Sequence, residues 1–360
     1  MVTPRFFPET GGVEMHVFQV SRHLLALGES VTVLTSDRSR RLPVNEMVEG
    51  IRVRRVPAWP GNRDYYFAPE IYSEVVRTDC DLIHVQSYHT LVPPVAMTAA
   101  IRVRKPYVVT FHGGGPFSHV RSAKQIIQRI ILRPLLARAS KLIAVAHFEI
   151  DLYSKQLNLP RKKFVLIPNG ADLPLPKDPA ISSSRDDALI VSVGRLEKFK
   201  GFQRLIRALP HVLKRRPNAH LKIFGSGPYQ QDLCSLAKQL GVEEKVLIHS
   251  IPPTERETLA AQLMRAGLFV LLSEYETHPL AALEAISLGC SVLVTDTSGL
   301  SELAEKGLAN AVPLNCSDEQ LAEAIIAQLN RPLIPKAIHL PSWNDCARDL
   351  LELYQSIARS

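Results

Sequence analysis

Two glutamates, Glu276 and Glu284, stand eight residues apart in the segment SEYETHPLAALEAISLG, between two apolar runs of the kind that form buried parallel strands. The pattern predicts a helix between these runs, with Pro279 as its first residue and Gly289 at its end. A helix N-terminus presents unpaired N–H groups and partial positive charge, which suit a diphosphate, while carboxylates can accept hydrogen bonds from sugar hydroxyls. The segment therefore predicts a site for a nucleotide sugar.

Two cations follow another apolar run, ALIVSVG, at the point where a strand of a parallel sheet would end. Arg195 can make forked hydrogen bonds to phosphate oxygens, and Lys200 can supply a point charge. Together they could neutralise a leaving diphosphate without a metal ion. The alternative is a pair of solvated loop charges, which is the usual state of exposed cations. The presence of the glutamate pair favours the diphosphate site.

Two glycine-containing loops also follow predicted strand positions. Gly11 and Gly12 precede the helical segment 13–28, and Gly225 and Gly227 follow the apolar run HLKIFG. Because glycine has no Cβ, such loops let backbone N–H groups approach a phosphate or a sugar closely. Each loop could instead be only a tight turn, so its position in the fold must decide between the two interpretations.

His112 ends the apolar run YVVTFH and precedes three consecutive glycines. A histidine at this end of a strand could donate a hydrogen bond to a sugar hydroxyl or to an acceptor, which makes it a candidate catalytic residue. His84 lies inside the run DLIHVQS and is interpreted as a core residue. Asp79 and Asp81 spell a DxD, but they precede a strand, at the edge of the sheet where ligands do not bind.

Several kinds of chemistry are disfavoured. The sequence holds no GxSxG, HExxH or Walker A motif and no Cys/His set with metal-ligand spacing, which argues against serine or zinc hydrolysis. Its five cysteines are scattered, which indicates reduced thiols with packing roles. No apolar run reaches 18 residues and no signal-peptide pattern opens the chain, so we expect a cytosolic protein.

The candidate residues need two parallel sheets to position them. Short apolar runs alternate with segments of helical period, which predicts two doubly wound α/β domains in the 360 residues. The proline- and serine-rich segment 171–187 indicates a linker, giving domains at 1–177 and 178–338 and a final helix within 339–360. Ligands bind beyond the carboxyl ends of such strands, so we expect the site in a cleft between the domains. Only Met1 and Val2 occupy the first strand position, so either the sequence begins late or the sheet tolerates a stub.

The positive charge is concentrated in the first half of the chain. The net charge is +8, to which residues 1–180 contribute +9 (24 Lys and Arg against 15 Asp and Glu). The basic residues are densest in segment 121–141, where they interleave with Ile and Leu. This segment could touch an anionic membrane surface, or it could be a core-facing helix with a solvated basic face. Nucleic acid is disfavoured, because no DNA-reading motif or aromatic-plus-basic sheet accompanies the charge.

Many motifs in order resemble one known family, the retaining, nucleotide-sugar-dependent glycosyltransferases of family 4, which have the GT-B fold. The resemblance covers nearly the whole chain. It rests on a PxxGGxE start at residues 8–14, DLIHVQS, TFHGG, IPNGAD, VGRLEKFKG, IFGSGP, the glutamate pair and a terminal SW helix.

The resemblance implies a role for each candidate. Arg195 and Lys200 would bind the donor diphosphate, which Gly12 would approach, and His112 would lie at the reaction centre. Glu276 would contact hydroxyls of the transferred sugar and Glu284 the ribose. Such enzymes need no metal or other cofactor. They retain the anomeric configuration, usually by front-face attack in which the leaving phosphate assists deprotonation of the acceptor, so no side-chain nucleophile is named. The last helix would cross back to the N-terminal domain.

The chain departs from the family pattern between its two glutamates. His278 and Pro279 stand where the family usually shows Phe-Gly. Proline has no N–H, so one phosphate donor is lost, and the N–H groups of Leu280 and Ala281 are left for the ligand. His278 adds a titratable group beside the sugar, where it could alter the choice of donor.

These observations predict a glycosyltransferase that moves a hexose-type sugar from a nucleoside diphosphate to a glycan or lipid-linked acceptor, in the cytosol or peripherally at the membrane. Two alternatives stay open at this stage. A GT-B nucleotide-sugar epimerase would consume the donor without an acceptor, and a non-catalytic protein would bind the donor without turnover.

Overall fold

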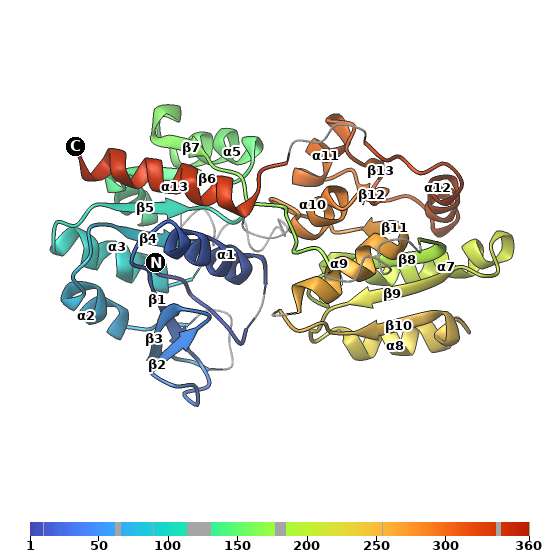
Figure 1. The fold of residues 1–360 in the computed structure, drawn as a ribbon, viewed down its shortest axis with the longest axis horizontal. Coiled ribbons are helices and arrows are strands. Elements are labelled where there is room, and N and C mark those ends of the chain that lie inside the picture. Colours follow the sequence, from blue (N-terminus) through green and yellow to red (C-terminus); the bar gives the residue numbers. More distant parts are fainter. Residues whose placement is uncertain are drawn as a thin grey trace. The chain divides into compact units, whose positions relative to one another are not determined.

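The computed structural model describes residues 1–9, 11–61, 66–88, 90–113, 131–176, 185–253, 255–335 and 340–359. They form two compact units (Figure 1). Unit 1 comprises Met1–Gly170 and Pro341–Ser360, and unit 2 comprises Ala171–Leu340. Within the described ranges, no helix is both long and apolar enough to cross a lipid bilayer.

The division between the units differs slightly from the sequence-based expectation. The chain enters unit 2 after Gly170 and leaves it after Leu340, where boundaries after residues 177 and 338 were expected. The reason is packing, because Ala171 and Leu173 are buried in a hydrophobic core of unit 2. The beginning of the proline-rich segment is therefore part of a folded unit rather than a free linker.

A mainly parallel sheet forms the centre of unit 1 (Figure 1). Its strands lie in the order β2-β3-β1 and β4-β5-β6-β7, and only β2 runs antiparallel to its neighbour. The strands are β1 (Thr32–Asp37), β2 (Asn45–Val48), β3 (Ile51–Pro57), β4 (Ile83–Gln86), β5 (Tyr107–Thr110), β6 (Lys141–Ala144) and β7 (Phe164–Leu166).

A single residue joins the two strand groups of unit 1. Val2 forms parallel bridges to Leu34 of β1 and to Val85 of β4. Its N–H donates to the His84 carbonyl at 2.8 Å, and its own carbonyl accepts from the Gln86 N–H at 2.8 Å. Val2 is buried at the centre of the sheet, and all parallel strands of unit 1 end at one common edge.

The hairpin of β2 and β3 has no counterpart among the strands expected from the sequence. β3 reads IRVRRVP, in which only alternate residues are apolar, so it lacks the continuous apolar run of its neighbours. Arg55 within it is buried, and its guanidinium donates to the Phe7 carbonyl at 2.7 Å and pairs with Glu46 at 2.6 Å. The buried, paired arginine interrupts the apolar run, so a search for apolar runs does not detect this strand.

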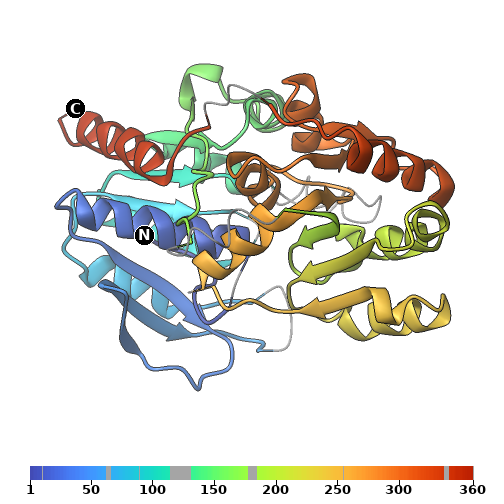
Figure 2. The same ribbon diagram turned by 45° about the vertical axis from the view of Figure 1, so that its right-hand side comes forward.

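The C-terminal helix packs on unit 1, where it lies beside the first helix (Figures 1 and 2). It starts with a capping box in which Ser342 and Asp345 each bond to the other's backbone N–H. Trp343 is 1% exposed, and a Cβ at Gly170 would lie 2.3 Å from its backbone nitrogen, so that contact requires glycine. The α-helices among the described residues of unit 1 are α1 (Gly12–Ala26), α2 (Glu70–Arg77), α3 (Val92–Arg102), α5 (His147–Leu157) and α13 (Trp343–Ala358).

Unit 2 holds a parallel sheet of strand order β10-β9-β8-β11-β12-β13. The order reverses beside β8, as in doubly wound folds that bind nucleotides. The five strands expected from apolar runs are confirmed, and the short β13 is additional. The strands are β8 (Asp186–Val193), β9 (His220–Phe224), β10 (Val246–His249), β11 (Ala266–Leu271), β12 (Val292–Thr295) and β13 (Asn310–Val312).

Helices cover both faces of this sheet (Figures 1 and 2). Leu189 and Ile190 are neighbours in β8, yet they belong to separate hydrophobic cores because successive side chains of a strand point to opposite faces. One core is shared with α7 (Phe202–Arg215), α8 (Gln230–Gln239) and α12 (Asp318–Asn330). The other is shared with α9 (Arg256–Arg265), α10 (Leu280–Ser287) and α11 (Ser298–Glu305).

Candidate active site

Lys200 and Glu276 meet at the carboxyl edge of the unit 2 sheet. Lys200 lies in the short 3-10 helix η2 (Lys198–Lys200) after β8, and Glu276 lies in the loop after β11. Their side chains form an ion pair with Nζ 2.6 Å from Oε1. Both side chains are largely shielded, at 18% and 14% exposed, so this attraction is stronger than that of a pair in bulk water. The residues are 76 positions apart in the sequence.

Hydroxyl groups and a glycine hold the loop of Glu276. Ser273 Oγ donates to Glu276 Oε1 at 2.6 Å, and the Glu276 N–H donates to Ser298 Oγ at 2.8 Å. The Gly299 N–H donates to the Glu276 carbonyl at 2.9 Å. A Cβ at Gly299 would lie 2.1 Å from the Thr277 carbonyl oxygen, so the close approach of α11 requires glycine there. The carboxylate is thus fixed in place before any ligand arrives.

Arg195 is placed differently from Lys200. Its side chain is 44% exposed, and its Nε lies 3.0 Å from a Glu197 carboxylate oxygen. The rest of the loop is tied down, because the Glu274 N–H donates to the Phe199 carbonyl at 2.8 Å. Arg195 therefore sits on a fixed loop, and its partially exposed guanidinium can exchange a weak surface pair for an anionic ligand.

Gly225 and Gly227 pack the loop after β9 against the loop after β8. A Cβ at Gly225 would lie 1.9 Å from the Gly194 carbonyl oxygen, and one at Gly227 would lie 2.5 Å from the Leu196 carbonyl oxygen. The Leu196 N–H also donates to the Ser226 carbonyl at 2.9 Å. The described structure thus accounts for both glycines by close backbone packing, which in turn supports the loop that carries Arg195 and Lys200.

The start of α10 differs from the sequence-based expectation. Pro279 precedes the helix as its N-cap, with φ −77° and ψ 78°, and the helix begins at Leu280. These angles are those of an inverse γ-turn, in which the Leu280 N–H donates to the His278 carbonyl at 2.9 Å. Leu280 is therefore already bonded and is a poorer phosphate donor than expected. Ala281 lies in the same first turn, while the predicted end of the helix is confirmed by Gly289 at φ 77°.

Glu284 lies on α10, buried at 3% exposed, and forms an ion pair with Arg256 of α9. Burial raises the pKa of Glu284, the Arg256 guanidinium opposes this rise, and Asp172 adds to it. Glu284 thus has a cationic partner that the sequence analysis did not identify. His278, half-buried, lies in the same loop as Glu276.

The candidate residue of unit 1, His112, follows β5 directly. Its Nε2 lies 2.8 Å from Oε1 of Gln86, which ends β4 and is completely buried. An amide oxygen can only accept, so the ring nitrogen donates in this arrangement. His16 of α1 contacts the same ring edge-on, with ring centroids 4.8 Å apart. His112 is therefore held on two sides by buried polar side chains.

Two further histidines of unit 1 are buried and neutral. Burial lowers the pKa of His16 to about 4, although its Nδ1 lies 2.7 Å from Asn169 Oδ1. Burial likewise holds the pKa of His84 well below its usual value. His84 lies 2.6 Å from Thr110 Oγ1 and 2.5 Å from the Tyr354 hydroxyl, in agreement with its interpretation as a core residue.

Gly12 is the first residue of α1, and an added Cβ there would meet no atom within 4 Å. Space for a close approach therefore exists beside Gly12. Of the glycines after His112, only Gly113 lies within the described residues, and its N–H donates to the buried Glu149 carboxylate at 3.0 Å. Asp79 is fully exposed and pairs with Lys105, which accounts for the DxD without a ligand. Among the described residues, no three His, Cys, Asp or Glu side chains gather as a metal site.

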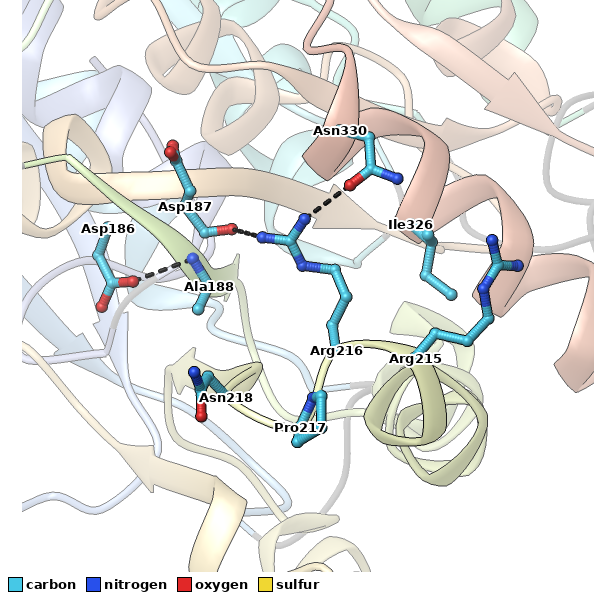
Figure 3. Close-up of a pocket in the computed structure, with 9 residues that line it drawn as sticks. All are labelled: Asp186, Asp187, Ala188, Arg215, Arg216, Pro217, Asn218, Ile326 and Asn330. Carbon is cyan, nitrogen blue, oxygen red and sulfur yellow. Dashed lines mark hydrogen bonds between the residues drawn. The ribbon is translucent and has the colours of Figure 1, made fainter.

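A surface pocket of about 500 Å³ lies elsewhere on unit 2, at the amino end of β8 (Figure 3). Inside it the Arg216 guanidinium donates to Asn330 Oδ1 at 2.6 Å and to the Asp187 carbonyl at 3.3 Å. This is the opposite end of the strand from Lys200, and ligands of doubly wound sheets bind at the carboxyl ends. The pocket is therefore separate from the candidate site. It is lined by Asp186, Asp187, Ala188, Arg215, Arg216, Pro217, Asn218, Ile326 and Asn330.

Four residues of the site were missed by sequence reasoning. Ser273 and Ser298 hold Glu276, Gln86 holds His112, and Arg256 pairs with Glu284. Ser273 and Gln86 stand where apolar strand runs end. The same signal singled out His112 and Lys200, so it could also have identified these two residues. Ser298 and Arg256 stand outside the motifs and carry no comparable signal.

Two family models match the chain in sequence. Residues 10–174 match Glycosyltransferase Family 4, and residues 176–339 match Glycosyl transferases group 1. One subunit of a phosphatidylinositol N-acetylglucosaminyltransferase from Arabidopsis thaliana is 28% identical, with 97% of this chain and 79% of that protein covered. A GDP-mannose:cellobiosyl-diphosphopolyprenol alpha-mannosyltransferase from Xanthomonas oryzae is also 28% identical, with 85% of this chain and 80% of that protein covered.

Solved structures show the same fold. A sucrose-phosphate synthase from Thermosynechococcus elongatus superposes with a TM-score of 0.77 at 20% identity, covering 100% of this chain and 99% of the other. An Anabaena protein in complex with UDP and glucose gives 0.72 at 17% identity, covering 99% of each. The matched families and named relatives are transferases, so they favour neither the epimerase nor the non-catalytic alternative. The chain is a glycosyltransferase of family 4, built from two Rossmann-like units of the GT-B fold.

Proposed function

We propose that this glycosyltransferase moves a hexose-type sugar from a nucleoside diphosphate to a glycan or lipid-linked acceptor, with retention of the anomeric configuration and without a metal ion. The names of relatives support the two substrate classes. One relative is named for GDP-mannose and a diphosphopolyprenol-linked acceptor, and another for phosphatidylinositol and N-acetylglucosamine. Within these classes we assign no particular sugar or base.

The Lys200–Glu276 ion pair carries the proposal. In the structure the cation and the carboxylate satisfy each other at the carboxyl edge of a doubly wound sheet. A bound donor would divide the pair: its diphosphate would take the Lys200 ammonium, and hydroxyls of its sugar would donate to Glu276. Each ion would keep hydrogen-bond partners, Lys200 in the diphosphate oxygens and Glu276 in the sugar hydroxyls, so neither shielded ion is left without a partner. Arg195 would add a forked contact to the diphosphate.

Glu284 would accept hydrogen bonds from the ribose of the donor. One of its oxygens, Oε1, already faces Arg256, which compensates the negative charge in a buried place. A buried carboxylate without such a partner would take up a proton and lose an acceptor position. Gly12 and Ala281 would supply close backbone approach to the phosphates, and His278 would flank the sugar.

The chemical step would need little covalent participation by the protein. The bond between the anomeric carbon and the phosphate oxygen breaks, and its electron pair stays on the diphosphate. The acceptor oxygen forms the new bond from the same face, and its proton passes to the leaving phosphate oxygen. Lys200 and Arg195 would stabilise the growing negative charge, which is where fixed electrostatics contribute most. His112 would hydrogen-bond a sugar hydroxyl or the acceptor.

Ligand-induced thermal stabilisation tests the donor site directly. A specific donor at 100 times its Kd raises the free energy of unfolding by about 2.7 kcal/mol. We expect one nucleotide class among UDP-, GDP- and ADP-sugars to stabilise the protein, in the presence of EDTA as well. Glu276→Gln should weaken the sugar-dependent part of this effect, whereas Glu274→Gln, an exposed neighbour, should leave it unchanged. Stabilisation by none of the donors would overturn the proposal.

We also propose a cytosolic location with peripheral contact to an anionic membrane through unit 1. The excess positive charge of the first half supports this proposal. Of the basic segment 121–141, only residues 131–141 lie within the described part of the chain. Co-sedimentation with vesicles of mixed neutral and anionic lipid should be salt-sensitive, and binding to purely neutral vesicles would contradict this location.

A further inference from the structure

Two exposed aromatic residues lie opposite each other in a short ladder beyond the end of β3. Trp59 and Phe67 exchange both backbone hydrogen bonds, at 3.0 and 2.7 Å. Residues paired in this way present their side chains on one face of the ladder. Trp59 is 40% exposed and Phe67 44%, although large aromatic side chains are usually better buried. The pair forms a small apolar surface on unit 1 that no described element covers.

An arginine lies against this surface. The Arg40 guanidinium carbon is 4.6 Å from the centre of the Trp59 ring, in cation–π geometry. Arg40 is exposed and has no ion pair among the described residues. Its charge is therefore available to an anion while its flat face rests on the indole. We call Arg40, Trp59 and Phe67 the aromatic–arginine shelf.

The shelf is built on a fixed backbone. Asp37, at the end of β1, accepts hydrogen bonds from Ser39 at 2.8 and 2.7 Å and from the Leu42 N–H at 2.9 Å. Burial acts to raise the pKa of Asp37, but these hydrogen bonds outweigh it and lower that pKa. A Cβ at Gly61 would lie 2.7 Å from the Arg38 carbonyl oxygen, so the loop of Arg40 and the ladder of Trp59 pack directly on each other.

The shelf stands at the same edge of the sheet as His112. Trp59 follows the carboxyl end of β3, Arg40 follows that of β1, and His112 follows that of β5. β3 and β5 are separated by β1, Val2 and β4, which makes four strand spacings or about 19 Å at ~4.8 Å per strand. A ligand that reaches from His112 to the shelf must therefore be extended.

We propose that the aromatic–arginine shelf binds the part of the acceptor remote from the reacting sugar, and that this part is a lipid carrying a phosphate or diphosphate. The inference rests on the proposed function, because it assigns the acceptor class for the same reaction. The chemistry of the shelf matches both halves of such a ligand. Trp59 and Phe67 offer apolar surface to an isoprenoid or acyl chain, and Arg40 offers a charged fork to the phosphate beside it.

Farnesyl diphosphate is a suitable probe, with farnesol and inorganic pyrophosphate as its separated halves. The chain has two tryptophans, Trp59 and the buried Trp343, so fluorescence of the full-length protein reports on the shelf. We expect saturable binding of farnesyl diphosphate with a change in Trp59 emission, and binding at least about tenfold weaker for each half alone. If pyrophosphate bound as tightly as farnesyl diphosphate, the shelf would be only an anion site. If farnesol bound as tightly, the shelf would be only an apolar patch. Either result overturns the proposal.

Variants locate the binding, which is measured by calorimetry because two of them remove the fluorophore Trp59. Trp59→Ala and Arg40→Gln should each weaken farnesyl diphosphate binding by about tenfold or more. Arg52→Gln is the matched control, since Arg52 is exposed on β3 but stands toward its amino end. Thermal melting of each variant checks folding, and Trp59→Phe, which keeps an aromatic face, should recover most of the affinity. Wild-type affinity in both shelf variants would overturn the assignment.

The outcome is separable from that of the proposed function. The donor panel measures nucleotide-sugar binding, which is assigned to residues other than those of the shelf. The farnesyl diphosphate titration is done without any donor. Donor stabilisation without probe binding would leave the glycosyltransferase assignment intact and reject the shelf. Binding of farnesyl diphosphate without stabilisation by any donor would support the shelf and reject the proposed donor site.

Discussion

The two units hold their candidate residues in opposite electrostatic states. In unit 2 the key side chains are charged and paired across elements, as Lys200 with Glu276 and Arg256 with Glu284. In unit 1 two buried, neutral side chains contact the His112 ring: His16, which has a pKa of about 4, and the amide Gln86. Charged pairs can be redistributed onto an anionic donor, whereas a neutral hydrogen-bonded network mainly fixes the orientation of one ring.

This difference between charged pairs in unit 2 and neutral partners in unit 1 predicts which step a substitution in each unit should affect. Loss of a charge in unit 2 should weaken donor binding and the stabilisation of a leaving diphosphate. Loss of a neutral partner in unit 1 should misplace a group without changing the charge that the donor meets. Kinetic constants that separate binding from turnover can therefore test the comparison.

The largest effect is expected for Lys200→Ala. Removal of the ammonium leaves Glu276 shielded without its cation and removes charge stabilisation from the leaving diphosphate, so kcat should fall about 10²–10³-fold. The exposed Lys198 in the same 3-10 helix provides a matched control, and Lys198→Ala should retain activity within about twofold. Steady-state transfer assays measure both, and equal losses in the two variants would show that the pair has no special role.

Substitution of a glycine by alanine should lower stability in unit 2 more than in unit 1. Gly225→Ala places a Cβ 1.9 Å from the Gly194 carbonyl oxygen, so it should lower the free energy of unfolding by about 1–3 kcal/mol. Gly12→Ala meets no atom within 4 Å and should change stability by less than about 1 kcal/mol. Urea unfolding followed by circular dichroism measures both changes. If Gly12→Ala lost more stability than Gly225→Ala, then Gly12 would be the tightly packed glycine and Gly225 the one beside open space, contrary to our interpretation.

Gln86→Leu tests the neutral side of the comparison. His112 loses the partner of its Nε2 but keeps its contact with His16, so we expect kcat to fall about tenfold while KM for the donor stays within about twofold. Gln156→Leu, also in unit 1 but on α5, is the control for loss of a glutamine. A rise in donor KM with kcat unchanged would mean that Gln86 acts through the donor site instead of through His112.

Arg256→Gln is expected to have the smallest effect at neutral pH and a distinct dependence on pH. Burial and Asp172 raise the pKa of Glu284 and Arg256 opposes them, so removal of Arg256 should raise this pKa further. Donor binding that uses the carboxylate is lost as pH falls through that pKa. The loss should therefore begin at higher pH in the variant, with an affinity decrease of about two- to fivefold near pH 7.

Nucleotide titrations between pH 5.5 and 8 measure the effect of Arg256→Gln. Arg265→Gln, at the other end of α9, makes the same charge change away from Glu284. Parallel pH profiles for wild type and Arg256→Gln would show that Arg256 does not control the ionisation of Glu284.

The sequence predicted the strands that are continuous apolar runs, and missed those that are not. β11 is buried along its whole length, and its continuous apolar run predicts a strand. β3 alternates and carries the buried Arg55, so its dependence on Glu46 and on a distant carbonyl could not be inferred from the run itself. Local apolar content identifies strands buried on both faces, whereas strands stabilised by polar pairing need the tertiary structure.

The candidate site shows the same limit. Motifs brought Lys200 and Glu276 into one hypothesis, and the structure adds their direct contact across 76 positions. The pairing of Glu284 with Arg256 and the bonded state of the Leu280 N–H arise from the packing of α9 and from the turn at Pro279. Motif spacing therefore selected the candidate residues, but it did not reveal the partners that set their charge or occupy their hydrogen bonds.

The return of the chain to unit 1 has a consequence for biosynthesis. Unit 2 is encoded without interruption, whereas unit 1 is completed only by α13, whose Trp343 is buried against Gly170. At ~5–20 residues per second, a ribosome needs roughly 10–40 s to make residues 171–360. During that time α1 stays uncovered along the side on which α13 packs. The first unit to emerge is thus the last to finish folding, and nascent chains should present α1 to chaperones for that interval.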